Sequence, residues 1–154
     1  MRQFRFLVIL AIVIAACKGS DNYTVQEVRL QSQTDSLNYL AGYFAGIRVK
    51  KNLFASDSTT TTVTNFVNAL EAAYNNNEGD VDNFPLDEHA KESAKLIGRT
   101  IREQERESGL MGISGWETDF DRIKQGLING LYFDTTYVHP DSAVIYLNRV
   151  IPRQ

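Results

Sequence analysis

Cysteine, histidine and long apolar runs are scarce in this chain, and each scarcity excludes a class of protein. Cys17 is the only cysteine, which excludes a disulfide within the chain and a zinc or redox site built from cysteine pairs. The two histidines, His89 and His139, stand 50 residues apart without a ligand motif such as H-E-x-x-H. We therefore expect no metal site and no cofactor.

The one unbroken apolar stretch near the amino terminus, Leu7 to Ile14, is too short to span a bilayer as a helix. It follows two arginines and precedes two alanines, which is the order of a secretory signal peptide. The run Ile14-Ala-Ala-Cys17 resembles the bacterial lipobox, in which the cysteine thiol receives a diacylglyceryl group and the chain is cut just before it. The sequence thus predicts a cleaved signal peptide over residues 1–16 and lipidation of Cys17.

Two other interpretations of this segment stay open: an ordinary signal peptide with a chance cysteine at its end, and an uncleaved hydrophobic anchor. If acyl chains are attached, each buried methylene contributes about 0.8 kcal/mol to membrane binding, so several chains hold a protein almost irreversibly. We expect a protein of the bacterial cell envelope, anchored by lipid to a membrane, with the outer membrane favoured. Residues 17–33 are predicted as the lipidated cysteine and a flexible tether.

The mature chain is mildly acidic. Residues 1–16 hold two of the 16 basic residues and none of the 19 acidic ones, which leaves 14 against 19 and a net charge of −5. This balance argues against a nucleic acid as a partner. The remaining 138 residues suffice for one domain or two very small ones.

Helical periodicity dominates residues 34–154. The apolar positions predict five amphipathic helices, which start at the cap Thr34 or Asp35, near Val63, at Pro85, near Trp116 and at Pro140. The first is expected to end near Leu53 and the third near Ser108. Because no stretch shows sustained alternation between hairpin turns, we predict an all-α helical bundle. Tyr132 to Val138 also suits a short extended segment.

An internal repeat is indicated by three landmarks that recur in the same order. Ala41-Gly42 and Ile97-Gly98 stand 56 residues apart, two apolar helical stretches stand 57 apart, and two helix starts stand 53 apart. These spacings predict a duplicated helix pair, with tandem copies over about 34–90 and 90–150.

Four glycines lie in pairs on helical faces: Gly42 with Gly46, and Gly126 with Gly130. Each glycine costs a helix about 1 kcal/mol, so we expect the pairs to let helices approach closely. The neighbouring aromatic residues more often fill a core or a partner interface than line a cofactor site; they are Tyr39, Tyr43 and Phe44.

The available carboxylates predict no catalytic site. They stand beside arginines, as on a solvated and salt-bridged helix face. These carboxylates are Glu103, Glu105, Glu107, Asp119 and Asp121, and the arginines are Arg99, Arg102, Arg106 and Arg122. We expect no catalytic residues in the chain, and Cys17 is the only residue with a predicted chemical role.

The segment from Asp35 to Arg48, with Tyr39, Gly42 and Gly46, and the following Phe66-Val-Asn-Ala-Leu70 resemble a known domain. It is the amino-terminal helical domain of FKBP-type peptidyl-prolyl isomerases of the macrophage infectivity potentiator kind. The resemblance covers roughly residues 34–150 and continues through Ile123-Lys-Gln-Gly-Leu-Ile-Asn-Gly-Leu131. It implies a helical domain that dimerises by intertwining and supports chaperone-like binding.

The catalytic domain of that family has no counterpart in this chain, because its Val-x-Val-x-Tyr-x-Gly strand pattern is absent. The resemblance therefore predicts a non-enzymatic, chaperone-like or protein-binding module without isomerase activity. The alternative is a dedicated adaptor or accessory subunit of one envelope complex. Expected partners are the membrane, protein clients or one envelope protein. The chain is expected to be a monomer with pseudo-dimeric halves or a homodimer.

Overall fold

The computed structural model describes residues 23–54, 59–107, 109–110, 113–114 and 116–132. Helices dominate these ranges, which confirms the predicted all-α character. The helices are α1 (Gln33–Leu53), α2 (Thr60–Tyr74), α3 (Glu78–Val81), α4 (Glu88–Arg106) and α5 (Phe120–Tyr132). One antiparallel pair of two-residue strands, β1 (Gly109–Leu110) and β2 (Ile113–Ser114), follows α4 and was not predicted.

Helix starts are fixed by side chains that accept hydrogen bonds from exposed backbone N–H groups. The Ser32 Oγ accepts from the Asp35 N–H at 3.0 Å, so the predicted cap at Thr34 or Asp35 is wrong by two or three residues. Asp35 lies inside the first turn, where its carboxylate accepts the Gln31 N–H at 3.1 Å. The two residues thus form a reciprocal cap, which is why the helix begins earlier than its apolar pattern does.

Three other boundaries differ from the sequence prediction. Pro85 lies before α4, whose N-cap is Asp87, and α4 ends at Arg106. Trp116 precedes α5, which begins only at Phe120. The segment between α2 and α4 contains the single-turn helix α3, which was not predicted, because a short polar segment can close one turn without an amphipathic face.

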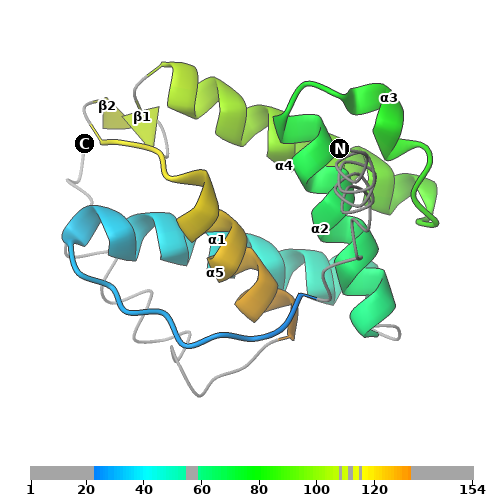
Figure 1. Ribbon diagram of the computed structural model, residues 1–154, viewed down its shortest axis with the longest axis horizontal. Helices are drawn as coiled ribbons and strands as arrows, with labels where there is room; N and C mark the ends of the chain where they lie inside the picture. Colours follow the sequence, from blue (N-terminus) through cyan, green and yellow to red (C-terminus); the bar gives the residue numbers. More distant parts are fainter. Residues whose placement is uncertain (1–22, 55–58, 108, 111–112, 115, 133–154) are drawn as a thin grey trace, which may run out of the picture.

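The helices pack as two crossing pairs, α1 with α5 and α2 with α4 (Figure 1). A Cβ on Gly42 would lie 1.8 Å from the Ile123 carbonyl oxygen, and one on Gly126 would lie 2.0 Å from the Tyr39 carbonyl oxygen. At the other crossing, a Cβ on Gly98 would lie 2.6 Å from the Leu70 carbonyl oxygen. The prediction that the glycines permit close helix contact is confirmed.

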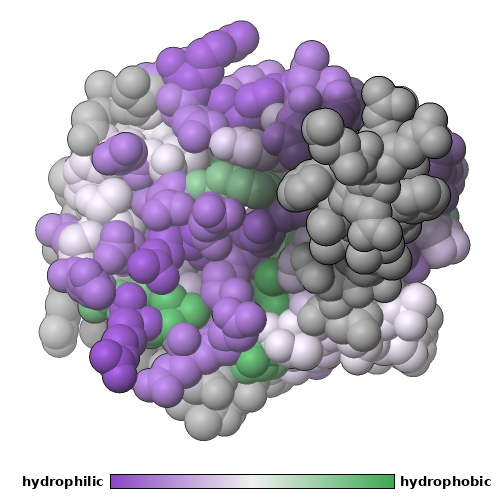
Figure 2. Space-filling model, in the orientation of Figure 1, coloured by the Kyte–Doolittle hydropathy of each residue, from purple (hydrophilic) through white to green (hydrophobic). Residues whose placement is uncertain are grey.

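The core joins these pairs. Its largest cluster holds Phe66 and Leu70 of α2 together with Leu127 and Leu131 of α5. Tyr39 and Tyr43 are 1 % and 0 % exposed, which confirms that these aromatic residues are packed inside the protein. Figure 2 shows a largely hydrophilic face with smaller hydrophobic areas. Leu30 and Leu96 are the large hydrophobic residues exposed within the described ranges.

Several predictions concern residues outside the described ranges. They are the signal peptide over 1–16, lipidation of Cys17, the helix starting at Pro140, and the extended segment suggested over Tyr132 to Val138, of which Tyr132 alone is described, as the last residue of α5. Within the described ranges, no helix is long and apolar enough to cross a membrane.

Candidate functional site

Residues 23–32, here called the strap, cross the helices in an extended form without regular secondary structure and then lead into α1 (Figure 1). They belong to the segment predicted as a flexible tether. Asn129 of α5 holds the main chain of the strap at Gln26. The Gln26 N–H donates to the Asn129 Oδ1 at 3.2 Å, and the Asn129 Nδ2 donates to the Gln26 carbonyl oxygen at 2.9 Å. One buried amide therefore pairs with both backbone groups of one residue.

Further hydrogen bonds fix the first residue of the strap. The Tyr132 hydroxyl donates to the Tyr23 carbonyl oxygen at 2.9 Å. The Tyr23 hydroxyl lies 2.8 Å from the Glu71 Oε2 and 3.2 Å from the Asn68 Oδ1, both on α2. Side chains of α2 and α5 thus bind this part of the strap; we call the surface that they offer to it the strap groove and define it by Asn68, Glu71, Asn129 and Tyr132.

Charge at the strap groove is balanced by Lys124 of α5. Its Nζ lies 2.7 Å from the Glu71 Oε1, while the other oxygen of that carboxylate accepts the Tyr23 hydroxyl. Burial of Lys124 opposes its charged form, but the hydrogen bond and charge of Glu71 outweigh it and raise the pKa of Lys124. The lysine therefore stays charged near neutral pH.

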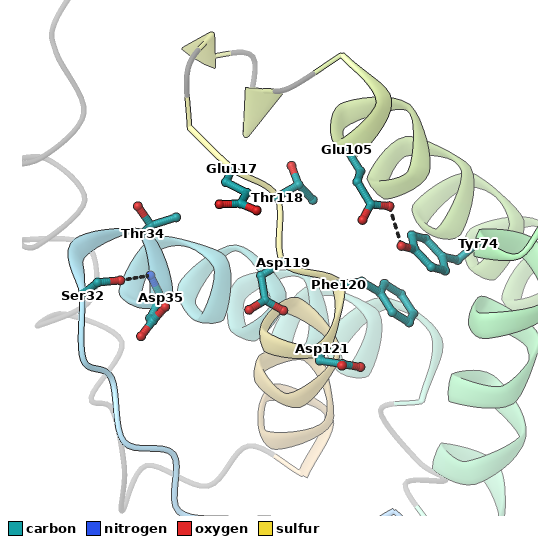
Figure 3. A pocket seen from close by; sticks show the side chains of 10 residues that line it. All are labelled: Ser32, Thr34, Asp35, Tyr74, Glu105, Glu117, Thr118, Asp119, Phe120 and Asp121. Atoms are coloured by element: carbon teal, nitrogen blue, oxygen red, sulfur yellow. Dashed lines mark hydrogen bonds between the residues drawn. The ribbon is translucent and has the colours of Figure 1, made fainter.

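A second feature is a pocket of about 690 Å³ at the starts of α1 and α5 and the end of α4 (Figure 3). We call it the acidic pocket, because five carboxylates line it: Asp35, Glu105, Glu117, Asp119 and Asp121. One wall is the Tyr74 ring, which stacks on Phe120 with ring centroids 3.8 Å apart. Together these residues form an open, negatively charged surface with one aromatic wall.

Tyr74 is held in its neutral form at this wall. Partial burial, followed by the hydrogen bond of its hydroxyl to the Glu105 carboxylate, raises the pKa of Tyr74 to about 12. Figure 3 shows the two side chains directed toward each other across the pocket. An anionic tyrosine beside a carboxylate would be repelled, so Tyr74 acts here as a hydrogen-bond donor.

The acidic and basic residues named in the sequence analysis lie in two different places in the structure. Glu105, Asp119 and Asp121 line the acidic pocket. Arg99 and Arg102 instead pair with Glu78 of α3, at 2.8 and 3.6 Å. Within the described residues, no cluster of three or more histidine, cysteine or acidic side chains could hold a metal ion.

The sequence analysis missed Asn129 as a functional residue. Its signal was present, because Asn129 is the one polar side chain in the run Gly126-Leu-Ile-Asn-Gly-Leu131. Asn129 is 0 % exposed, and a buried amide requires hydrogen-bond partners. The sequence did not reveal that its partner is the strap, 103 residues away in the chain.

Comparison with known proteins identified no relative: no family model, no curated protein and no solved structure matches this chain.

Proposed function

We propose that this protein is a lipid-anchored, non-enzymatic binding module of the bacterial cell envelope that holds extended protein segments in a chaperone-like manner. The observation that carries the proposal is the contact of Asn129 with both main-chain groups of Gln26. Every residue except proline offers the same N–H and C=O pair, so this contact can hold an extended segment without regard to its side chain.

The predicted anchor would place the groove close to a membrane, with the outer membrane favoured. Tyr23 follows Cys17 by only six residues. A chain spans at most about 3.6 Å per residue, so a docked strap would keep Tyr23 within ~20 Å of a lipidated Cys17. Such a module would meet client segments as they emerge at the membrane surface.

Glycine contacts support the proposed duplication, but they match Gly98 with a different glycine of α1 than the sequence landmarks do. A Cβ on Gly46 would approach the carbonyl oxygen of Leu127 and the N–H of Leu131, at 2.2 and 2.8 Å. A Cβ on Gly98 would approach the carbonyl oxygen of Leu70 and the N–H of Tyr74, at 2.6 and 2.8 Å. Leu70 and Leu127 stand 57 residues apart in the chain, and so do Tyr74 and Leu131. This is the spacing that the sequence analysis found between the two apolar helical stretches. These contacts favour a correspondence of Gly46 with Gly98 within the proposed duplication, in place of Gly42 with Gly98.

Basic residues one turn beyond these two glycines extend the correspondence. The Lys50 Nζ donates to the Tyr132 carbonyl oxygen at 3.2 Å, at the end of α5. The Arg102 Nη1 donates to the Ala73 carbonyl oxygen at 2.6 Å, near the end of α2. In each case a cation meets the negative end of the crossing helix. This exchange of partners between copies supports a monomer with pseudo-dimeric halves, related to the intertwined helical domain of FKBP-type isomerases.

The proposal is tested by photo-crosslinking in the native envelope, with a crosslinking amino acid in place of Gln125 beside Asn129 and, as a matched control, in place of Thr100 on α4. Mass spectrometry then identifies the captured proteins. Many unrelated envelope proteins captured at position 125, and few at position 100, would support a holder of extended segments. No capture above the control would overturn the proposal.

A dedicated adaptor is the second candidate. It is favoured by the scarcity of exposed large hydrophobic residues, since only Leu30 and Leu96 qualify within the described ranges. General holders of unfolded proteins usually present larger apolar patches. Capture of one partner at stoichiometric yield from position 125 would identify the protein as an adaptor.

A further inference from the structure

We propose that the strap is a displaceable occupant of the strap groove, and that a client segment containing a Tyr-x-x-x-x-Val pattern takes its place. This inference rests on the proposed function and names how its site is controlled. The ligand of the groove is then an extended peptide, and the strap competes with that peptide for the same contacts.

The strap is held by hydrogen bonds and by two half-buried side chains, Tyr23 and Val28, which pack against the core. None of residues 23–32 falls in the buried class, and Leu30 is 37 % exposed. A recess of about 480 Å³ lies beside the strap at the first turns of α5, lined in part by Gln26, Arg29 and Gln125. Segments with few buried apolar contacts open locally well below the cost of global unfolding. The strap can therefore leave while the helices stay folded.

The groove side chains keep partners when the strap leaves. The Asn129 Nδ2 also donates to the Tyr39 hydroxyl at 2.9 Å, and the Asn129 Oδ1 also accepts from the Gln125 Nε2 at 2.9 Å. Glu71 keeps its ion pair with Lys124 at 2.7 Å. These contacts orient the groove for a ligand in advance, which reduces the entropy lost on binding.

The contacts of the strap define the ligand. Asn129 requires one residue with a free N–H and C=O, which is Gln26 in the strap. Three residues earlier, a tyrosine hydroxyl reaches Asn68 and Glu71. Two residues later, Val28 packs on the cluster of Tyr39, Leu40 and Tyr43. The preferred ligand is therefore an extended segment with tyrosine and a β-branched residue five positions apart.

Competition by the strap predicts a measurable change in affinity. A tethered ligand acts at millimolar effective concentration. The apparent Kd for a free peptide is therefore the intrinsic Kd divided by the fraction of molecules in which the strap has left the groove. The probe is a fluorescent peptide with the sequence of residues 23–32. The protein is the full mature chain with Cys17→Ser, with or without the strap substitutions Tyr23→Ala and Gln26→Pro, which leave every groove residue unchanged.

Fluorescence anisotropy should show the strap variant binding the peptide at least ~10-fold more tightly than the chain with the intact strap. A control peptide with proline in place of glutamine lacks the N–H that Asn129 accepts, and should bind the strap variant at least ~5-fold more weakly. Equal affinity of the two proteins for the peptide, or no binding to either, would overturn the inference.

Hydrogen exchange of the unsubstituted chain gives an independent test that needs no strap variant. The Gln26 amide should exchange far faster than the Leu127 amide inside α5, since local release of the strap exposes only the former. Equal exchange rates would show that the strap leaves only on global unfolding and would contradict the inference. Client capture in the envelope without strap-dependent peptide binding would retain the proposed function alone. Strap-dependent peptide binding without client capture in the envelope would support the groove and reject the proposed function.

Discussion

Asn38 of α1 holds the backbone of Asp119, although the two residues are 81 positions apart in the chain. The Asn38 Oδ1 accepts the Asp119 N–H at 2.9 Å, and the Asn38 Nδ2 donates to the Glu117 carbonyl oxygen at 3.0 Å. The same nitrogen donates to the Thr34 carbonyl oxygen at 3.0 Å. Because Asn38 is 0 % exposed, these bonds form away from water and set where the chain turns into α5.

The substitution Asn38→Leu should lower the free energy of unfolding by about 2–4 kcal/mol, because the Glu117 carbonyl and the Asp119 N–H would lose their buried partner. The measurement is urea unfolding followed by circular dichroism. The matched control is Asn52→Leu, at an exposed position of the same helix, which should change stability by less than ~0.5 kcal/mol. Equal effects of the two substitutions would contradict the assigned role of Asn38.

Gly126→Ala should destabilise the α1 and α5 pair strongly, by about 3 kcal/mol or more, because the new methyl group would meet backbone and not a movable side chain. Gly79→Ala is the control, since a Cβ there has no atom within 4 Å, and it should be neutral or stabilise by up to ~1 kcal/mol. Thermal unfolding of both variants provides the comparison. A Gly126→Ala variant as stable as the unsubstituted protein would refute the close helix contact.

Tyr74 should ionise only near pH 12, because its burial and its bond to Glu105 both favour the neutral phenol. The folded pKa is raised above the unfolded value, so the stabilisation is complete below about pH 10 and is lost as the pH rises through about 12. NMR titration of labelled tyrosine, with the signal identified by its loss in Tyr74→Phe, measures this pKa. Glu105→Gln should lower it toward the ordinary value, and an unchanged pKa would disprove the role of Glu105.

Cys17→Ser should release the protein from the membrane fraction and abolish incorporation of labelled fatty acid, because serine has no thiol to accept the diacylglyceryl group. The control substitution, Lys18→Ser, leaves the thiol in place and should keep the label. Fractionation of cells together with metabolic labelling measures both properties. Labelling that persists in Cys17→Ser would refute the predicted lipid anchor.

The helices were predictable because their signals lie close together in sequence. Apolar spacing placed α1, α2 and α4 within a few residues of their observed bounds, and paired glycines indicated close helix contact. The N-cap at Ser32 was missed because a serine before a polar turn resembles loop sequence until its Oγ is seen to meet the Asp35 N–H. The acidic pocket was missed because its wall combines Tyr74 with Phe120, 46 residues later in the chain.

The sequence by itself determined the helical class, the approximate helix bounds and the small residues at the crossings, since each follows from propensity and periodicity over a few turns. Only the tertiary structure decided that α1 pairs with α5 and α2 with α4, and that the strap lies in a groove instead of hanging free. The physical reason is that these contacts join residues far apart in the chain. Whether the Asn129 amide finds the Gln26 main chain depends on how the helices between them pack, and no local pattern encodes that packing.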